Sequence, residues 1–458
     1  MSVTGVALSA VLVAGAGGSA PARAARACND SVATAVPQPT SAQMKVSGLG
    51  KLRVAPLDRR LDLVAAPFSD PTSVTNPLFP IARLSSVVLN GKVDGKAFRT
   101  ETTLLPETRI IEWSPGQCVK TLVSQYVAYL DGRIQEVALD FYAQADDGSV
   151  WYFGEDVYNY VNGVVADTSG TWLAGKEGPA AMIMPADPKV GDVSRPENIP
   201  GLVWEEVATK TVGKTVQGPR GPVTGAMVGQ ELHDDGTYSD KIFVPGYGEF
   251  FTAHEGDVEA LAVAIPTDSV PGPPPVHLER LSAGTERVFR LARAKHWRAA
   301  SRSLAAIRAA WTAHRADGVP PRLVGPANRA LRALEREVGL RKARRAGDAA
   351  LDLLQSALDL QLRYRAPAEI DCARFGLWTR QARVDAAAGR RAALSGDVAT
   401  LEWLRDRFAW ALDSVAVTRI DTLLERLRGN VTDDELVSAS RTAAKLQAIP
   451  QCGYPYWR

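Results

Sequence analysis

Apolar and polar side chains alternate along residues 133–145, which is the pattern of a β-strand with two different faces. The odd positions are apolar, namely Val137, Leu139, Phe141 and Ala143. The even positions are polar, namely Glu136, Asp140, Tyr142 and Gln144. A second, aromatic-rich segment over residues 149–160 follows Asp147-Gly148, a strong signal for a hairpin turn. We therefore expect two antiparallel strands joined at this turn.

Similar glycine-containing turns recur from Asn90-Gly91 to Asp235-Gly236, and their spacing predicts a meander of antiparallel strands. We expect four of these strands over residues 120–130, 133–145, 149–160 and 164–172. A meander that buries one face tends to close on itself or to pack on a second layer. The first part of the chain is therefore predicted to be a barrel-like or sandwich β domain.

The hydrophobic period becomes helical beyond residue 277, where apolar side chains such as Val288, Leu304 and Ile307 suit amphipathic helices. Later helices are expected over residues 326–340, 343–364, 368–395, 398–414, 418–428 and 432–449, with Asp397 and Thr432 as N-caps. The predicted fold class is α+β multidomain, with an antiparallel β domain followed by an all-α helical bundle.

Five prolines between residues 266 and 276 separate the two patterns and favour an extended, semi-rigid linker. A chain of 458 residues also exceeds the size at which one core keeps growing. We expect a signal peptide at 1–27, an N-terminal extension at 28–73, the β domain at 74–265, the linker at 266–277, the bundle at 278–450 and a tail at 451–458.

The first residues resemble an export signal. An apolar stretch over residues 3–16 is followed by small residues and two A-x-A sites ending at Ala24 and Ala27, although a basic start is missing. Cys28 would be the acylated residue of a lipoprotein, but Ala25 and Arg26 fit a lipobox poorly. We expect an extracytoplasmic protein, secreted or associated with the cell envelope, and we disfavour a lipoprotein.

Four cysteines in an exported chain meet an oxidising compartment and usually pair. Three pairings are open in principle, and one bridge within each half is the simplest: Cys372 with Cys452, and Cys28 with Cys118. Their wide spacing disfavours zinc and thioredoxin-like chemistry.

The net charge of +2 hides an uneven distribution. Residues 278–458 hold about 32 basic and 20 acidic side chains, so the helical half is strongly basic and the first half is acidic. Solvated surfaces explain such a split, but so would attraction between the domains or an anionic envelope polymer bound to the basic half. Because we expect the protein to be exported, we do not expect a nucleic-acid partner.

The register of the hairpin decides whether two carboxyl groups meet. A two-residue turn at Asp147-Gly148 would place Asp140 opposite Glu155, as a general acid and base or a cation site requires. A three-residue turn starting at Asp146 would place Asp140 opposite Gly154 instead, and would gather the aromatic rings on one face. Asp140 and Glu155 are therefore weak catalytic candidates.

The aromatic side chains of the same strands form either the core of the sheet or a groove for a glycan or a lipid. If they form a groove, Tyr142, Trp151, Tyr152 and the neighbouring Gln144 are the expected ligand-binding residues.

Four motifs resemble a family of secreted bacterial β-rich proteins of unassigned function. They are the hairpin DFYAQADDGSVWYFGE, the upstream segment Asn76-Pro77-Leu78-Phe79-Pro80, the segment from Gly170 to Gly175, and the segment from Phe243 to Gly248. Ala145 and Phe243 depart from the family pattern. The resemblance covers residues 74–251 and implies a β-rich fold, but it carries no catalytic residue to this chain.

Known catalytic and phosphate-binding motifs are absent from the sequence, and His233 and His254 match no known metal-ligand spacing. We expect no metal and no cofactor. Asp371, Asp385 and Asp397 lie among arginines, as in salt-bridged helix faces. The favoured function is an exported binding or scaffolding protein whose helical domain also offers a surface for a protein partner. The alternative is a hydrolase of glycans or esters that uses Asp140 and Glu155, with His233 or His254.

Overall fold

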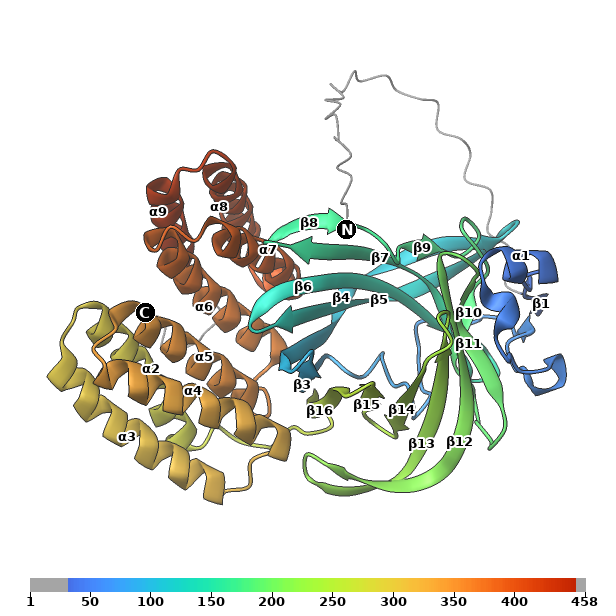
Figure 1. Ribbon diagram of the computed structural model, residues 1–458, viewed down its shortest axis with the longest axis horizontal. Coiled ribbons are helices and arrows are strands. Elements are labelled where there is room, and N and C mark those ends of the chain that lie inside the picture. The colour runs from blue at the N-terminus through green and yellow to red at the C-terminus, as the bar shows by residue number, and fades with distance from the viewer. Residues whose placement is uncertain (1–31, 450–458) are drawn as a thin grey trace.

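The computed structural model describes residues 32–449, so the predicted signal peptide and tail lie outside the described part. One antiparallel sheet of 14 strands forms the first domain, and helices α2 to α9 form the second (Figure 1). The predicted fold class is confirmed. None of the helices in residues 32–449 is both long and apolar enough to cross a membrane.

The strands follow one another around the sheet in the order β10-β7-β6-β5-β4-β3-β16-β15-β14-β13-β12-β11, with β8 and β9 paired to β7. Their bounds are β3 Ser86–Val93, β4 Lys96–Ser114, β5 Gln117–Leu130, β6 Arg133–Gln144, β7 Val150–Val161, β8 Val164–Asp167, β9 Trp172–Leu173, β10 Ala181–Met184, β11 Val193–Ile199, β12 Val203–Gly218, β13 Gly221–His233, β14 Tyr238–Val244, β15 Gly248–His254 and β16 Asp257–Ile265. The strand expected over 164–172 is thus two short strands, β8 and β9.

The sheet curls until its two end strands, β10 and β11, contact each other. Register shifts in β4, β7 and β12 add local twist to the long strands, and this twist brings the ends together. The curl gives the sheet an inside and an outside, which decides where each face of a strand points.

The N-terminal segment covers one side of the sheet. It contains β1 Thr34–Ala35, α1 Ser41–Val46, two short 3₁₀ turns and β2 Val64–Ala65, and β1 pairs with β2. Leu49 packs against Trp204 and Leu232 of the sheet. The predicted N-terminal extension is therefore folded onto the β domain.

The helical domain consists of α2 Val276–Arg293, α3 Trp297–Ala316, α4 Pro321–Gly339, α5 Ala343–Gln361, α6 Pro367–Ala387, α7 Arg391–Phe408, α8 Ser414–Thr432 and α9 Leu436–Gln447. The single helix expected over 368–395 is wrong, because Gly389 adopts a positive φ of 69° and ends α6. Asp397 lies inside α7 and Thr432 ends α8, so neither is the expected N-cap.

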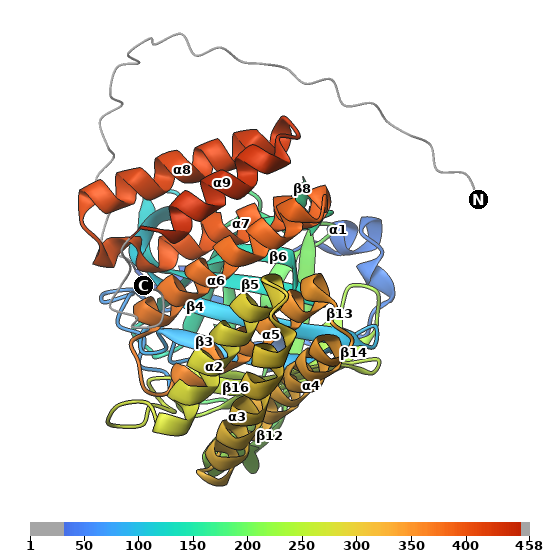
Figure 2. The ribbon, with the colours of Figure 1, turned by 90° about the vertical axis from the view of Figure 1, so that its left-hand side faces the viewer.

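Helix α7 joins the two domains by lying against β4, β6 and β8 (Figure 2). Val137 on the apolar face of β6 packs in one cluster with Ala399, Trp378 and Trp403 of the helices. Strand β16 contacts α4, and its residues Ala262 and Ile265 share one hydrophobic core with helices α2 to α6. The domains are therefore in extensive apolar contact.

A buried group of charges also crosses this interface. Glu101 of β4 accepts hydrogen bonds from Arg99 and from Arg407 of α7, and Arg99 also pairs with Asp359 of α5 at 2.7 Å. Arg374 of α6 pairs with Asp359 and with Asp371, each at 2.8 Å. Charges of both signs come from the helical side, so the contact is not simply an acidic domain against a basic one.

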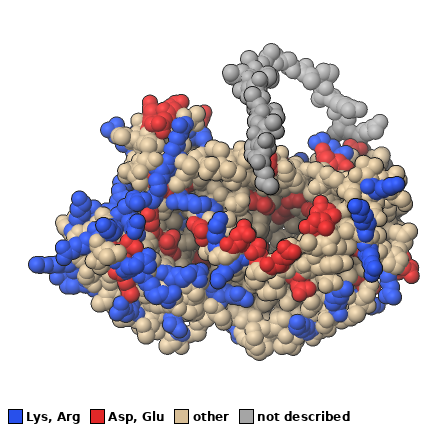
Figure 3. All heavy atoms as spheres, in the orientation of Figure 1, with Lys and Arg blue, Asp and Glu red and all other residues tan. Residues whose placement is uncertain are grey.

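In a second ionic contact at the interface, the basic residue belongs to the acidic β domain and the acidic residues belong to the basic helical domain. Arg133 of the β domain lies 2.9 Å from both Asp385 and Asp397 of the helices. These aspartates were expected to pair with arginines of their own helices, and Asp385 does also pair with Arg390. The basic excess of the helical domain lies on its surface, where Lys and Arg side chains gather (Figure 3).

The first part of the proline-rich linker is held by contacts with both domains. Asp268 is fully buried, accepts a hydrogen bond from Tyr247 at 2.9 Å, and is itself contacted by Arg363 at its carbonyl oxygen. The backbone N–H of Val270 donates to Arg363 O at 2.7 Å. The linker is therefore packed between the sheet and the end of α5.

Candidate ligand cavity

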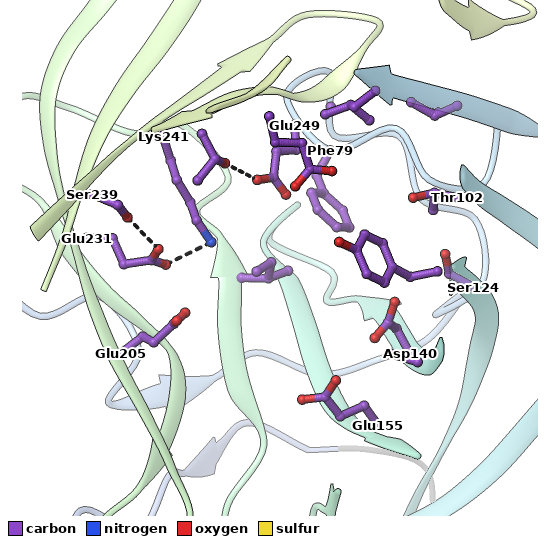
Figure 4. Close-up of a pocket in the computed structure, with 18 of the residues that line it drawn as sticks. Phe79, Thr102, Ser124, Asp140, Glu155, Glu205, Glu231, Ser239, Lys241 and Glu249 are labelled. Carbon is purple, nitrogen blue, oxygen red and sulfur yellow. Dashed lines mark hydrogen bonds and ion pairs between the residues drawn. The ribbon is translucent and has the colours of Figure 1, made fainter. Parts of the chain in front are cut away.

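A cavity of about 730 Å³ lies inside the curled sheet, between strands β5 to β7 and strands β12 to β16 (Figure 4). Phe79, Pro80 and Ile81 from the segment before β3 also line it. This volume falls in the range of small-molecule sites. Its carboxyl side chains are Glu136, Asp140, Glu155, Glu205, Glu231, Asp234, Asp235, Glu249 and Glu259.

The polar face of β6 forms part of this lining. Glu136, Asp140 and Tyr142 occupy the even positions of the strand and face the cavity, whereas Val137 faces the helices. The polar positions would face water in a flat sheet, but the curl turns them inward. An interior lined with carboxyl groups follows from the alternation together with the curvature.

The hairpin between β6 and β7 combines the two registers that the sequence left open. Ala145 accepts from Gly148 N–H across a turn of three residues, and Tyr142 is therefore opposite Tyr152. Further along, β7 contains one extra residue, a bulge at Phe153-Gly154, and Asp140 is opposite Glu155 again. The carboxyl groups thus face each other even though the turn is the longer one.

The bulge requires a glycine at position 154. Its φ is 123°, a conformation that side-chain-bearing residues rarely adopt, and a Cβ there would clash with the carbonyl oxygen of Trp172 on β9. The close approach of β9 and the unusual φ both require glycine. The pairing of Asp140 with Glu155 therefore depends on Gly154.

Asp140 and Glu155 lie on one wall of the cavity, and no Lys or Arg of residues 32–449 pairs with either of them. Burial raises the pKa of Asp140 to about 7, although Tyr152 opposes the rise by donating a hydrogen bond to Oδ1 at 2.8 Å. Burial and then the charge of Asp140 raise the pKa of Glu155 to about 10. Glu197, brought to this wall by β11, has a pKa of about 8 because of burial and of Glu205. Glu155 and Glu197 therefore hold protons at neutral pH, and Asp140 is partly protonated there.

The opposite wall contains a different arrangement, in which acids are neutralised. Lys241 Nζ lies 2.9 Å from Glu231 Oε1, and Ser239 donates to Glu231 Oε2 at 3.0 Å (Figure 4). Burial acts to raise the pKa of Glu205, but Lys241 and His233 lower it to about 2. A hydrogen bond with Glu205 raises the pKa of His233. This wall therefore has its own counter-charges.

Glu205, Glu231 and His233 also form the one set of three metal-type ligands within 4.8 Å of one another in residues 32–449. Their donor types suit a divalent cation such as zinc. However, Lys241 already pairs with Glu231, and His233 Nε2 hydrogen-bonds with Ser239 at 3.0 Å. The sequence did not reveal this set because its members come from two strands, β12 and β13.

The four residues expected to bind ligand lie in different places. Tyr142 lines the cavity and contacts Phe79 edge-on at 5.0 Å. Tyr152 is buried, stacks on Tyr142 with ring centroids 4.8 Å apart, and donates a hydrogen bond to Asp140. Trp151 is fully buried in the outer core, and Gln144 accepts hydrogen bonds from the backbone of Thr75 and Asn76. An aromatic groove on these strands is thus not observed in the described structure.

Three of the four motifs behind the family resemblance meet at the cavity. The hairpin provides Asp140 and Glu155, the segment 76–80 provides Phe79, and the segment 243–248 provides Tyr247. The backbone N–H of Gly246 donates to Pro77 O at 2.8 Å and so ties two of these segments together. The fourth motif contributes the strand β9 that requires Gly154.

His233 and His254, the histidines considered for the alternative hydrolase, both line the cavity, with ring centroids 5.3 Å apart. Sequence reasoning missed the partners that surround them, such as Glu205, Lys241 and Glu249. Each occupies an alternating position of its strand, where polar residues normally indicate a solvent-exposed face. Only knowledge of the curl would have placed them inside.

Cys118 and Cys372 carry no free thiol. The residues that we expect to pair with them, Cys28 and Cys452, lie outside the described residues, so both pairings stay predictions.

A scan of known protein families gives no model that matches the chain, and a search of curated proteins gives no match either. The case for a function therefore rests on the cavity.

Proposed function

We propose that this protein is an exported binding protein of the cell envelope and that its β domain holds a small ligand inside the curled sheet. The observation that carries the proposal is the cavity of about 730 Å³, in which apolar side chains and convergent polar groups occur together. The location rests on the export signal expected from the sequence.

The charges of the cavity lining favour some of the ligand classes expected from the sequence over others. A glycan or a lipid headgroup fits a polar interior, whereas an anionic polymer would meet carboxyl groups on both walls. Such a polymer, or a protein partner, suits the helical domain better. There, a shallow groove along α8 contains Arg419, Arg426 and Lys445 beside the exposed Val415.

A cavity-filling substitution tests the binding proposal. Ala138 lines the cavity on β6 and is 3% exposed, so Ala138→Phe should occupy its centre. The fluorescent probe N-phenyl-1-naphthylamine should brighten with the wild-type protein and not with this variant. Val212→Phe adds the same ring at an exposed position of β12 and should leave binding unchanged.

Circular dichroism must show that both variants are folded. If the probe brightens equally with folded Ala138→Phe, it binds elsewhere and the proposal fails.

The hydrolase alternative is favoured by one specific feature, the unequal pKa values of Asp140 and Glu155 across the same pair of strands. Two nearby carboxyl groups with different pKa values are typical of general acid and base pairs. The enzyme proposal predicts turnover of a nitrophenyl glycoside or ester that Asp140→Asn or Glu155→Gln removes while probe binding remains. A broad substrate panel without turnover would leave the binding protein as the conclusion.

A further inference from the structure

Three neighbouring strands place a row of polar side chains on one wall of the cavity. Ser124 of β5 is opposite Asp140 of β6, and Asp140 is opposite Glu155 of β7. All three side chains line the cavity, and Figure 4 shows them on the wall that faces Glu231 and Lys241. Directly opposed positions on adjacent strands have Cβ atoms about 5 Å apart, so one small group can reach neighbouring members of the row.

This row lacks a positive charge. Within the part of the chain that the structure describes, Lys241 is the one Lys or Arg that lines the cavity, and it is paired with Glu231 on the other wall. Buried carboxyl groups are normally paired with a cation or bound to a metal. Ionisation of this row would therefore need a counter-ion from outside the described residues.

The hydroxyl group of Ser124 gives an independent indication of a ligand. Ser124 is fully buried, and its Oγ has no hydrogen-bond partner within the described residues. A buried hydroxyl without a partner costs free energy, and such groups in native structures usually have a role. Here the hydroxyl group lies beside Asp140 and toward the cavity, where a ligand donor would satisfy it.

A metal ion is a poor occupant of this row. A set of three metal-type ligands within 4.8 Å of one another does occur in residues 32–449, but on the opposite wall, at Glu205, Glu231 and His233. Two carboxyl groups and a hydroxyl group instead match the three donors of an organic ammonium group.

We propose that the cavity binds an organic amine with an apolar body, and that its ammonium group donates hydrogen bonds to Asp140, Glu155 and Ser124. This inference rests on the proposed binding function and specifies its ligand class. The apolar body lies against Phe79, Leu84 and Tyr142, which line the same cavity. Bringing a cation to the row also offsets the cost of ionising its two acids.

Three probes of equal length and different charge test the proposal: octylamine, 1-octanol and octanoate, each titrated calorimetrically into the full-length protein at pH 7.5. Octylamine should bind at least tenfold more tightly than octanol, and octanoate should bind most weakly. Asp140→Asn and Glu155→Gln should each weaken octylamine binding at least tenfold, while octanol binding should change less than threefold. Ser124→Ala should weaken octylamine binding several-fold.

Asp156→Asn is the matched control. Asp156 is the next residue on β7, but it points to the outer face and pairs with Arg109 at 2.9 Å. This variant should bind octylamine as the wild type does. Circular dichroism must show a folded protein in every case, and Glu155→Gln alone suffices if Asp140→Asn does not fold.

Other outcomes overturn the inference in recognisable ways. Equal binding of octylamine and octanol would show an apolar cavity without charge selection, and the binding function would stand. Binding of N-phenyl-1-naphthylamine with no binding of octylamine would have the same meaning. Calcium binding that is lost in Glu155→Gln, with no amine binding, would make the row a metal site. Failure of all probes, including N-phenyl-1-naphthylamine, would remove the binding function itself.

Discussion

Replacing Asp140 with asparagine should make the protein more stable above neutral pH. Asp140 is 8% exposed and is surrounded by Tyr152 and by the acids Glu136, Glu155 and Glu249, with no cation that lowers its pKa. Asparagine keeps an oxygen that can accept the hydrogen bond from Tyr152, and it has no proton to lose. The substitution therefore removes the ionisation and preserves the contact.

The magnitude follows from the difference in pKa between the folded and unfolded chain. Well below pH 3.8 the carboxyl group of Asp140 is protonated in both states, so it contributes no penalty. As the pH rises, the unfolded chain loses the proton near 3.8 while the folded chain keeps it to about 7. The free energy of unfolding falls across this window, by about 4 kcal/mol at most, and the loss is complete above pH 7.

Urea unfolding followed by tryptophan fluorescence at pH 4 and at pH 8 measures this effect. Asp140→Asn should match the wild type within about 1 kcal/mol at pH 4 and exceed it by roughly 2–4 kcal/mol at pH 8. Asp156→Asn, on the outer face, should show no such gain. If Asp140→Asn is destabilised equally at both pH values, Asp140 has a stabilising cation and the description of the wall is wrong.

Three further predictions concern the stability of the fold. Gly154→Ala should cost more than about 2 kcal/mol in urea unfolding and abolish probe binding; Gly148→Ala in the same hairpin, also at positive φ but with only Ala186 Cβ near at 3.5 Å, should cost about 1 kcal/mol and keep binding. Glu101→Gln leaves Arg374 and Arg407 without their shared acid and should cost about 3–5 kcal/mol, whereas removing the exposed Arg308–Glu335 pair should cost less than about 1 kcal/mol. Non-reducing peptide mapping should find Cys372 bridged to Cys452, a bridge worth roughly 4 kcal/mol because it closes a loop of about 80 residues; two free thiols would refute it.

The strands and most helices could be predicted from the sequence because their patterns are local. The alternation in β6 and the Asp-Gly turn gave both the strand and the hairpin within a residue or two. The helix expected over 368–395 failed because that range runs through Gly389, which ends α6 at a positive φ.

The site could be predicted only in part, because it depends on contacts between distant strands. Asp140 and Glu155 were candidates since they share one hairpin, and the two-residue turn gave their pairing. The observed turn is the three-residue one, however, and only the bulge at Gly154 makes it compatible with that pairing. Trp151 was a reasonable binding candidate by residue type, yet the three-residue turn places it opposite Ala143, in the apolar core outside the cavity. Ser124 could not be predicted as a site residue, since a serine within a strand belongs to no recognised motif.

The packed linker has a consequence for how a ligand would be felt beyond the β domain. Tyr247 lines the cavity, and its hydroxyl group donates to Asp268, the buried residue of the linker. The same stretch is hydrogen-bonded to Arg363 after α5, at Asp268 O and Val270 N. A segment anchored in this way is not a free hinge between the two domains. A ligand that displaced the Tyr247 ring would therefore act directly on a segment to which the helical domain is also attached.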